Sequence, residues 1–522
     1  MTKTRNIAKS TAAMAAATLS SRITGLLRTW MMAFALGNTV ITSAYQVANN
    51  MPNVIFDLVA GGLLGAAFIP IFMLEKEKHG KSGGNKFACN ILNLTIVVLG
   101  VLSILATIFA PAVIATQTFT VGNTAHVTET AILFFRIFAF QILFYGISGV
   151  LTAVLNGELV YFMPAFAPAI NNIVVIASFM AYAIIAPTDA NTALIVLAIG
   201  TTLGVVVQCI MQIPSLIRSG FKWEPIFSLK DPALFAALKI AIPTFIYIVG
   251  MLIAFTCRNA FSLQVGEIGP STILYAWTWY QLPYGVIAVS LSRTMFTEMS
   301  EASAKNDIKR LRGQVNIGLS STLLLIIPLA MLMFMLANPL MSLFRAGQFN
   351  TDDVKLVASI LQVWVISLPF YSVIMYLYNV FAAIKKFGTF ALVSCLAVIL
   401  QCFLYWILCT PNSIGLYGIP IADLVYYVLC CIVLLIILKT KIGKFNIAEI
   451  VWRAIRVLFA SIIGCTVSMF ISNFIDTGNV SILNGLLILI VAGGAGLIAT
   501  FLLCWLFQIP EIKMLMRKIF KR

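Results

Sequence analysis

Residues 481–508 read SILNGLLILIVAGGAGLIATFLLCWLFQ, a run of 28 residues without a charged side chain. About 20 consecutive apolar residues allow a helix to cross the hydrocarbon core of a bilayer. Comparable runs recur along all 522 residues, of which 61% are hydrophobic and only 10% are charged. Soluble domains carry about a quarter charged residues, and membrane β-barrels alternate apolar with polar residues, so both classes are excluded. The sequence predicts an all-α polytopic membrane protein.

Fourteen apolar runs are candidate transmembrane helices. Their approximate limits are 9–36, 43–73, 87–116, 128–156, 161–186, 191–217, 235–260, 270–297, 313–343, 354–383, 387–410, 415–438, 450–475 and 481–508. With the N-terminus placed in the cytoplasm, 27 of the 34 Lys and Arg residues fall in inner segments, and only Arg345 and Lys355 fall in outer ones. This asymmetry follows the positive-inside rule, which predicts both termini in the cytoplasm. The net charge of +16 therefore reflects membrane topology, and no nucleic acid partner is expected.

Polar side chains of the second span lie at helical spacing. Its polar residues are Ser43, Gln46, Asn50, Asn53 and Asp57. Offsets of three, four and seven residues place all five on one stripe of a helix. Such a stripe either joins helices through hydrogen bonds or faces a water-filled cavity. Both interpretations stay open from the sequence.

Three arginines, Arg22, Arg28 and Arg136, lie within the first four spans. Asp57 is the only acid at comparable depth. An unpaired arginine in a dry bundle costs about several kcal/mol, so water or an anionic ligand is expected beside it. Arg28 is the strongest candidate, whereas Arg22 and Arg136 could instead pair with Asp57 or Glu129. The pattern predicts a cationic, water-accessible cavity in the N-terminal half.

The remaining charged residues within the spans are few. Arg258 lies near a helix end, where a long side chain can reach the interface. Asp423 is the only deep acid of the C-terminal half, and it is either a cation site or a structural hydrogen-bond acceptor. The ten Cys lie in apolar runs without a C-x-x-C pair, and only two His occur, so no metal centre is expected. No P-loop occurs either, which indicates transport without nucleotide hydrolysis and without a cofactor.

Four motifs resemble one family in the order of its helices. Ser21-Arg22-Ile23-Thr24-Gly25-Leu26-Leu27-Arg28 resembles the first-helix signature S-R-x-x-G-x-x-R of the MurJ (MviN) lipid II flippases. Residues 43–70, with Pro52-Asn53 and Gly61-Gly62, resemble the second helix of that family. Residues 282–293 resemble its eighth helix, and residues 344–349 (Phe-Arg-Ala-Gly-Gln-Phe) resemble an outer loop before the tenth.

The resemblance implies a member of the MOP exporter superfamily. It implies a six-helix lobe over 1–220, a second one over 221–445, and two additional helices with a basic cytoplasmic tail over 446–522. It also implies a transporter and not an enzyme, acting in peptidoglycan biosynthesis, cell wall biogenesis and cell shape. By alternating access, the protein would flip lipid II, an undecaprenyl-pyrophosphate-linked disaccharide peptide, from the inner to the outer leaflet of the bacterial cytoplasmic membrane.

The implied site residues combine the family's roles with the residue patterns above. Cavity residues that would hold the pyrophosphate are Arg28, Arg22, Arg136, Asn50, Asn53 and Gln46, with Asp57 and Ser43 as gating or charge partners. Arg258 would add cavity charge, and a groove beside helices 13 and 14 would hold the lipid tail. Expected partners are lipid II, membrane lipids and cell-wall synthesis or division proteins. The family often has differently charged residues where this chain has Thr29, Ser43, Asn50, Phe56, Asp57, Thr278 and Gln281, so a less charged cavity is expected.

Three alternatives stay open. The chain could be another lipid-linked oligosaccharide flippase or a drug or ion exporter of the same superfamily. It could be an enzyme that handles polyprenyl phosphates, for which Asp352-Asp353 is the only adjacent acidic pair. We interpret that pair instead as the first turn of a helix capped by Thr351. A scaffold for cell-wall synthesis that does not transport is the third alternative.

Overall fold

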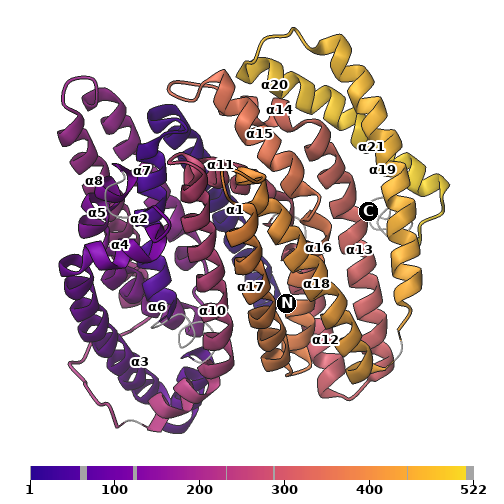
Figure 1. Cartoon of the computed structure of the whole chain (residues 1–522). Coiled ribbons are helices and arrows are strands. Elements are labelled where there is room, and N and C mark those ends of the chain that lie inside the picture. Colours follow the sequence, from indigo (N-terminus) through magenta and orange to yellow (C-terminus); the bar gives the residue numbers. More distant parts are fainter. Residues whose placement is uncertain are drawn as a thin grey trace. The chain divides into compact units, whose positions relative to one another are not determined.

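The computed structural model describes residues 2–58, 68–121, 126–230, 232–285, 289–443 and 445–512. Every regular element in these residues is a helix (Figure 1). The chain forms two compact units, Met1–Leu263 and Gln264–Arg522. The division into two six-helix lobes and a C-terminal pair of helices stays a prediction.

The N-terminal unit is built from ten helices, the last of which continues two residues beyond it. They are α1 (Thr2–Leu36), α2 (Val40–Phe56), α3 (Phe68–Ile108), α4 (Ala110–Thr118), α5 (His126–Phe138), α6 (Gln141–Gly157), α7 (Phe162–Ile185), α8 (Ala190–Ile210), α9 (Ile213–Arg218) and α10 (Pro232–Val265). Around Tyr45 of α2, the rings of Phe134 and Phe138 stand edge-on and that of Phe179 is tilted, which packs α2 against α5 and α7.

The C-terminal unit continues the series. Its helices are α11 (Gly269–Tyr280), α12 (Val289–Ala304), α13 (Ile308–Met335), α14 (Ala337–Ser342), α15 (Thr351–Val365), α16 (Leu368–Ala383), α17 (Phe387–Leu408), η4 (Gly415–Tyr417), α18 (Gly418–Ile442), α19 (Ile447–Ile475), α20 (Ile482–Ile488), the π-helix η5 (Leu489–Gly493) and α21 (Gly494–Leu506). Aromatic side chains pack its interior, among them Trp364 against Tyr280 and Trp277.

Nine helical segments in the described residues are long and apolar enough to cross a membrane, and two bent helix pairs raise the number to eleven. Each of the eleven overlaps one of the fourteen predicted spans. The other three predicted spans are 9–36, 43–73 and 270–297, which hold α1, α2, α11 and α12. The helices of these three are polar or short: α2 has 17 residues and α11 has 12. The exact number of spans therefore stays a prediction.

The interval between the predicted spans 43–73 and 87–116 is helical. Helix α3 runs through it with one break, at His79 (φ −122°) and Gly80 (φ +68°). The charged residues at 75–78 are Glu and Lys, which are good helix formers. Only at Gly80, whose left-handed backbone suits a residue without Cβ, does the helix break.

Two predicted spans are bent helix pairs. Helices α5 and α6 meet at 45°, and α15 and α16 meet at 55°. In the second pair Pro369 stands in the first turn of α16, where its missing N–H interrupts the hydrogen-bond ladder.

The cap predicted for α15 is wrong by one residue. Asn350, not Thr351, accepts from the N–H groups of Asp352 and Asp353 at 2.8 and 2.9 Å, and Asp353 accepts from the N–H of Asn350 in return. This capping box confirms that the acidic pair is a helix start.

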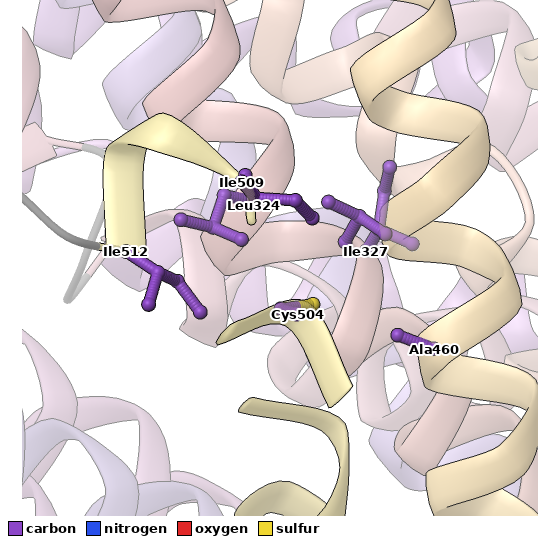
Figure 2. Close-up of a cluster of buried hydrophobic side chains, with 7 residues drawn as sticks. Leu324, Ile327, Ala460, Cys504, Ile509 and Ile512 are labelled. Carbon is purple, nitrogen blue, oxygen red and sulfur yellow. The ribbon is translucent and has the colours of Figure 1, made fainter. Parts of the chain in front are cut away.

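The C-terminal segment, residues 507–512, folds back onto the second unit. Ile509 and Ile512 pack with Cys504 of α21 against Leu324 and Ile327 of α13 (Figure 2). Val457 and Ala460 of α19 complete this buried cluster. Beside it, Arg453 of α19 donates to the carboxylates of Glu449 and of the buried Glu511. We call residues 507–512 the C-terminal hook, because they join α13, α19 and α21.

Candidate functional site

Helix α2 divides the predicted polar stripe between two environments. Ser43 is fully buried and belongs to the packed face of the helix. Gln46, Asn50, Asn53 and Asp57 are half-buried. The amide nitrogen of Asn50 is buried and has no hydrogen-bond partner. A buried donor without an acceptor is costly, so this amide is a candidate for binding water or a ligand.

Arg28 lies on α1 and is half-buried. Among the described residues it forms no ion pair, and Asp57, predicted as its alternative partner, is not in contact with it. The Arg28 guanidinium is close enough to the hydroxyls of Tyr45 and Tyr145 for its charge to act on both. The Tyr145 hydroxyl lies beside the side chain of Asn53. Helices α1, α2 and α6 therefore converge on a group that we call the Arg28 cluster: Arg28, Tyr45, Asn53 and Tyr145.

Tyr145 was not predicted from the sequence. It lies in α6 within a run of apolar residues, where a tyrosine resembles an ordinary packing residue. Its hydroxyl gains significance only because the fold brings α6 beside Arg28 and Asn53. The Tyr45 hydroxyl is already hydrogen-bonded to that of Thr201, at 3.2 Å. The cluster therefore offers one guanidinium, one carboxamide and the phenolic hydroxyl of Tyr145, which together can donate hydrogen bonds to an anionic ligand.

Contacts with α7 hold α1 in place beside α2. The side-chain amide of Asn172 donates to the carbonyl of Ser21 at 3.3 Å and to the hydroxyl of Thr24 at 3.1 Å. A Cβ at Gly25 would stand 3.5 Å from that amide nitrogen, an ordinary contact. The first part of the motif, at Ser21 and Thr24, is thus the surface on which α7 packs, and Arg28 lies one turn after Thr24.

The structure does not bring the other predicted arginines into the cluster. Arg22 is exposed, one and a half turns before Arg28. Arg136 and Glu129 are exposed on α5, on the face opposite Phe134 and Phe138, and among the described residues they form no ion pair with each other. Their roles in binding stay predictions.

Arg258 is half-buried on α10 and adjoins a hydrogen-bonded chain to α4. In that chain Asn259 donates to Gln117 at 2.9 Å, and Gln117 donates to Thr256 at 2.7 Å. These contacts join α10 to α4 within the N-terminal unit, close to Arg258 along α10.

Asp423 lies in the C-terminal unit, on α18, and is fully buried. Its carboxylate accepts from the indole N–H of Trp364 at 3.0 Å, from the amide of Gln401 at 2.7 Å and from the hydroxyl of Tyr405. No group of three or more potential metal ligands occurs within the part of the chain that the structure describes. A carboxylate surrounded by donors fits the structural alternative, because a cation site requires oxygen acceptors.

An apolar groove of about 470 Å³ opens in the C-terminal unit. It is lined by residues of α13, α15, α16, α18 and α19, such as Leu323, Phe334, Phe370, Leu435 and Ile455. No charged or polar side chain lines it. Helix α19 is the thirteenth predicted span, so the groove lies where the resemblance implied one, although residues of the fourteenth span do not line it.

Comparison with known proteins identifies relatives that match most of the chain. The family model for the lipid II flippase MurJ matches residues 32–488. The probable lipid II flippase MurJ of Borreliella burgdorferi is 24% identical over 449 residues, covering 84% of this chain and 85% of the relative. The lipid II flippase MurJ of Burkholderia cenocepacia is 28% identical over 357 residues, covering 67% of this chain and 68% of the relative.

Solved structures share the fold. A lipid II flippase MurJ in an inward closed conformation superposes with a TM-score of 0.75 at 23% identity, over 94% of this chain and 98% of that one. An inward-facing multidrug resistance MATE transporter of the MOP superfamily has a TM-score of 0.69 at 16% identity, over 81% and 94%. The fold is that of the MOP superfamily. With the family model covering most of its length, the chain belongs to the lipid II flippase MurJ family.

Proposed function

We propose that the protein flips lipid II from the inner to the outer leaflet of the bacterial cytoplasmic membrane by alternating access. Membership of the MurJ family supports this function, as does the polytopic helical fold. The observation that carries the proposal is Arg28, a half-buried arginine of the N-terminal unit without a carboxylate partner among the described residues.

The Arg28 cluster suits a pyrophosphate. A guanidinium presents a planar fork of donors that fits two phosphate oxygens, and such charge-assisted bonds are about twice as strong as neutral ones. Tyr145 and Asn53 place further polar groups beside it, and the unpartnered amide of Asn50 lies one helical turn from Asn53. Because an arginine kept from water is costly without an anion, an anionic ligand relieves the cost.

The groove of the C-terminal unit suits a polyprenyl tail. Its lining is entirely apolar, so it can bind hydrocarbon but offers no donor to a sugar or a phosphate. A cationic drug, the cargo of a multidrug exporter, would instead require a carboxylate in the binding site. The chemistry of the Arg28 cluster therefore favours an anionic lipid-linked substrate over a cationic one. Cell-wall synthesis or division proteins stay a predicted class of partner.

Complementation of a bacterium depleted of its own lipid II flippase tests the proposal. Arg28→Ala should abolish accumulation of lipid II in the outer leaflet while the protein still inserts in the membrane, and Arg28→Lys should retain part of the activity. Arg310→Ala removes an arginine from an exposed pair with Glu301 and should flip normally, which makes it the matched control.

The double variant Arg28→Ala with Asp57→Asn separates binding from charge pairing. If Arg28 served only to neutralise Asp57, the double variant would recover flipping. An inactive but stable double variant supports substrate binding. The scaffold alternative would be favoured by a different pair of results: the depleted bacterium grows with the Arg28→Ala variant, and the wild-type protein itself moves no lipid II.

The proposed topology has fourteen spans with both termini in the cytoplasm. In a variant without native cysteines, an impermeant thiol reagent added to intact cells should label cysteines at 188, 350 and 412. Cysteines at 80, 306 and 442 should react only after the membrane is permeabilised. Labelling of position 306 in intact cells would overturn the fourteen-span arrangement without affecting the assignment of Arg28.

A further inference from the structure

Residues 221–228 join α9 to α10 without regular secondary structure and lie along α3. We call them the strap. Two asparagines of α3 each bind both backbone groups of one strap residue. Asn85 pairs with the N–H and the carbonyl of Lys222 at 3.1 and 2.5 Å, and Asn90 pairs with those of Ser228 at 2.7 and 2.9 Å. These side chains bind the strap as a neighbouring β-strand would.

Between these two attachment points the strap makes a tight turn. The N–H of Ile226 donates to the carbonyl of Glu224 at 2.8 Å, which folds the backbone around Pro225. The amide of Asn93 donates to the carbonyls of both Glu224 and Ile226, at 2.9 and 2.8 Å. Asn93 also accepts from the indole N–H of Trp223 at 2.9 Å. Side chains of α3 therefore satisfy most of the polar backbone of the strap.

The attachment points indicate the direction of the strap. Lys222 is bound at the level of Asn85, the turn at the level of Asn93, and Ser228 at the level of Asn90. Eight helical residues correspond to about 12 Å along α3. From Asn85 the strap thus runs along α3 toward its apolar part, turns at the level of Asn93 and runs back to Asn90. Just beyond Asn93 the side chains of residues 96–98 are apolar and exposed, as expected of a helix face in contact with lipid.

Alternate residues of the strap and of the turn that follows it are exposed and apolar. Trp223, Phe227 and Leu229 are 61%, 53% and 61% exposed, and Pro225 between them is exposed as well. Exposed cations flank this stripe at Arg218, Lys222 and Lys230. An aqueous loop requires neither an apolar outer stripe nor side chains that satisfy its backbone. Both features are needed where a non-helical backbone meets the edge of a bilayer.

We propose that the strap is a lipid-binding surface that seats in the headgroup region of the cytoplasmic leaflet and prefers anionic phospholipids. The aromatic side chains of Trp223 and Phe227 suit the interface between water and hydrocarbon. The flanking Arg and Lys side chains attract the negative surface of that leaflet. This surface is separate from the Arg28 cluster, and its role does not depend on which substrate the protein moves.

Site-directed fluorescence on the full chain in lipid nanodiscs tests this proposal. Phe227→Cys in a variant without native cysteines carries an environment-sensitive label, and Lys305→Cys, on an exposed cytoplasmic segment, is the matched control. Discs of phosphatidylcholine alone are compared with discs that also contain phosphatidylglycerol. The label at 227 should be quenched by lipid-borne quenchers and protected from iodide, several-fold more strongly in the anionic discs. The label at 305 should be open to iodide in both.

A second variant examines the charge preference. Adding Lys222→Gln and Lys230→Gln should remove the difference between the two kinds of disc. Inorganic phosphate added to phosphatidylcholine discs should not reproduce the effect of the anionic lipid. Full access of iodide to position 227 in both kinds of disc would overturn the proposal. Protection in cell membranes but not in discs would also overturn it, because another protein would then cover the strap.

Discussion

Two polar sites, one in each unit, differ in how completely their hydrogen bonds are satisfied. In the N-terminal unit, Arg28 has no carboxylate partner among the described residues, and the amide nitrogen of Asn50 has no acceptor. In the C-terminal unit, the buried carboxylate of Asp423 receives hydrogen bonds from Trp364, Gln401 and Tyr405. A polar group whose bonds are complete stabilises the fold, whereas one with bonds to spare is available to a ligand. Substitutions at these two sites should therefore affect different properties.

The largest effect on stability is expected from Asp423→Ala. Removing the carboxylate leaves three donors without an acceptor in a dry interior, which should lower the free energy of unfolding by about 3 kcal/mol. Thermal unfolding of the detergent-solubilised protein measures this loss. Asp352→Ala, at an exposed position in the first turn of α15, is the control and should cost less than about 1 kcal/mol. An unchanged melting temperature for Asp423→Ala would remove the distinction between the two units.

Tyr145→Phe should reduce the rate of flipping about fivefold with little loss of stability. The substitution keeps the ring and removes only the hydroxyl beside Asn53 and Arg28, and one hydrogen bond is worth about 1 kcal/mol. Initial rates of outer-leaflet accumulation provide the measurement. Tyr182→Phe makes the same chemical change on α7, outside the Arg28 cluster, and should leave flipping unchanged. Equal effects of the two substitutions would place Tyr145 among the packing residues.

Asn50→Leu and Asn172→Leu form a contrasting pair within the N-terminal unit. Asn172 donates two hydrogen bonds to α1, so its replacement should destabilise the protein by about 1–2 kcal/mol. The amide nitrogen of Asn50 has no partner to lose, so its replacement should leave the melting temperature unchanged or raise it while slowing flipping. A drop in stability with Asn50→Leu would mean that this amide joins helices.

The smallest effect is expected from Gly25→Ala. The new Cβ would stand 3.5 Å from the amide nitrogen of Asn172, which is ordinary contact distance. Alanine also favours the helix by about 1 kcal/mol over glycine. Stability should be unchanged or slightly higher, and flipping should persist. A loss of flipping at full stability would show that the backbone of α1 approaches α7 more closely during transport than in this conformation.

The membrane character of the chain could be predicted from sequence because hydrophobicity is a local property. Eleven apolar helical segments overlap predicted spans. Among the described residues, three predicted spans contain no helix that is both long enough and apolar enough to cross a membrane. Their helices, α1, α2, α11 and α12, contain most of the polar motifs. Polar residues within a span weaken the hydrophobic signal in the part of the protein that is of most functional interest.

The site could be predicted only in part. Arg28 and the stripe of α2 follow from spacing within one helix, but Tyr145 joins them through packing between helices that are far apart in sequence. The exposed position of Arg136 depends on which face of α5 packs inward, and Phe134 and Phe138 decide that face. The hydrogen bonds of Asp423, on α18, likewise come from two other helices, α15 and α17. Residues that depend on tertiary contacts could not be assigned from one sequence.

The C-terminal hook also affects how the chain is made. Ribosomes synthesise proteins from the N-terminus, so α13 and α19 emerge well before Ile509, Glu511 and Ile512. Until residues 507–512 have been made, Arg453 lacks the partner that Glu511 supplies and, among the described residues, pairs only with Glu449, and Leu324 and Ile327 lack part of their cover. The second unit therefore completes this packing only after the hook has been synthesised. Quality control of truncated chains thus has a chemical basis: a product that stops before residue 507 exposes an apolar surface and lacks one of the two carboxylates that neutralise Arg453.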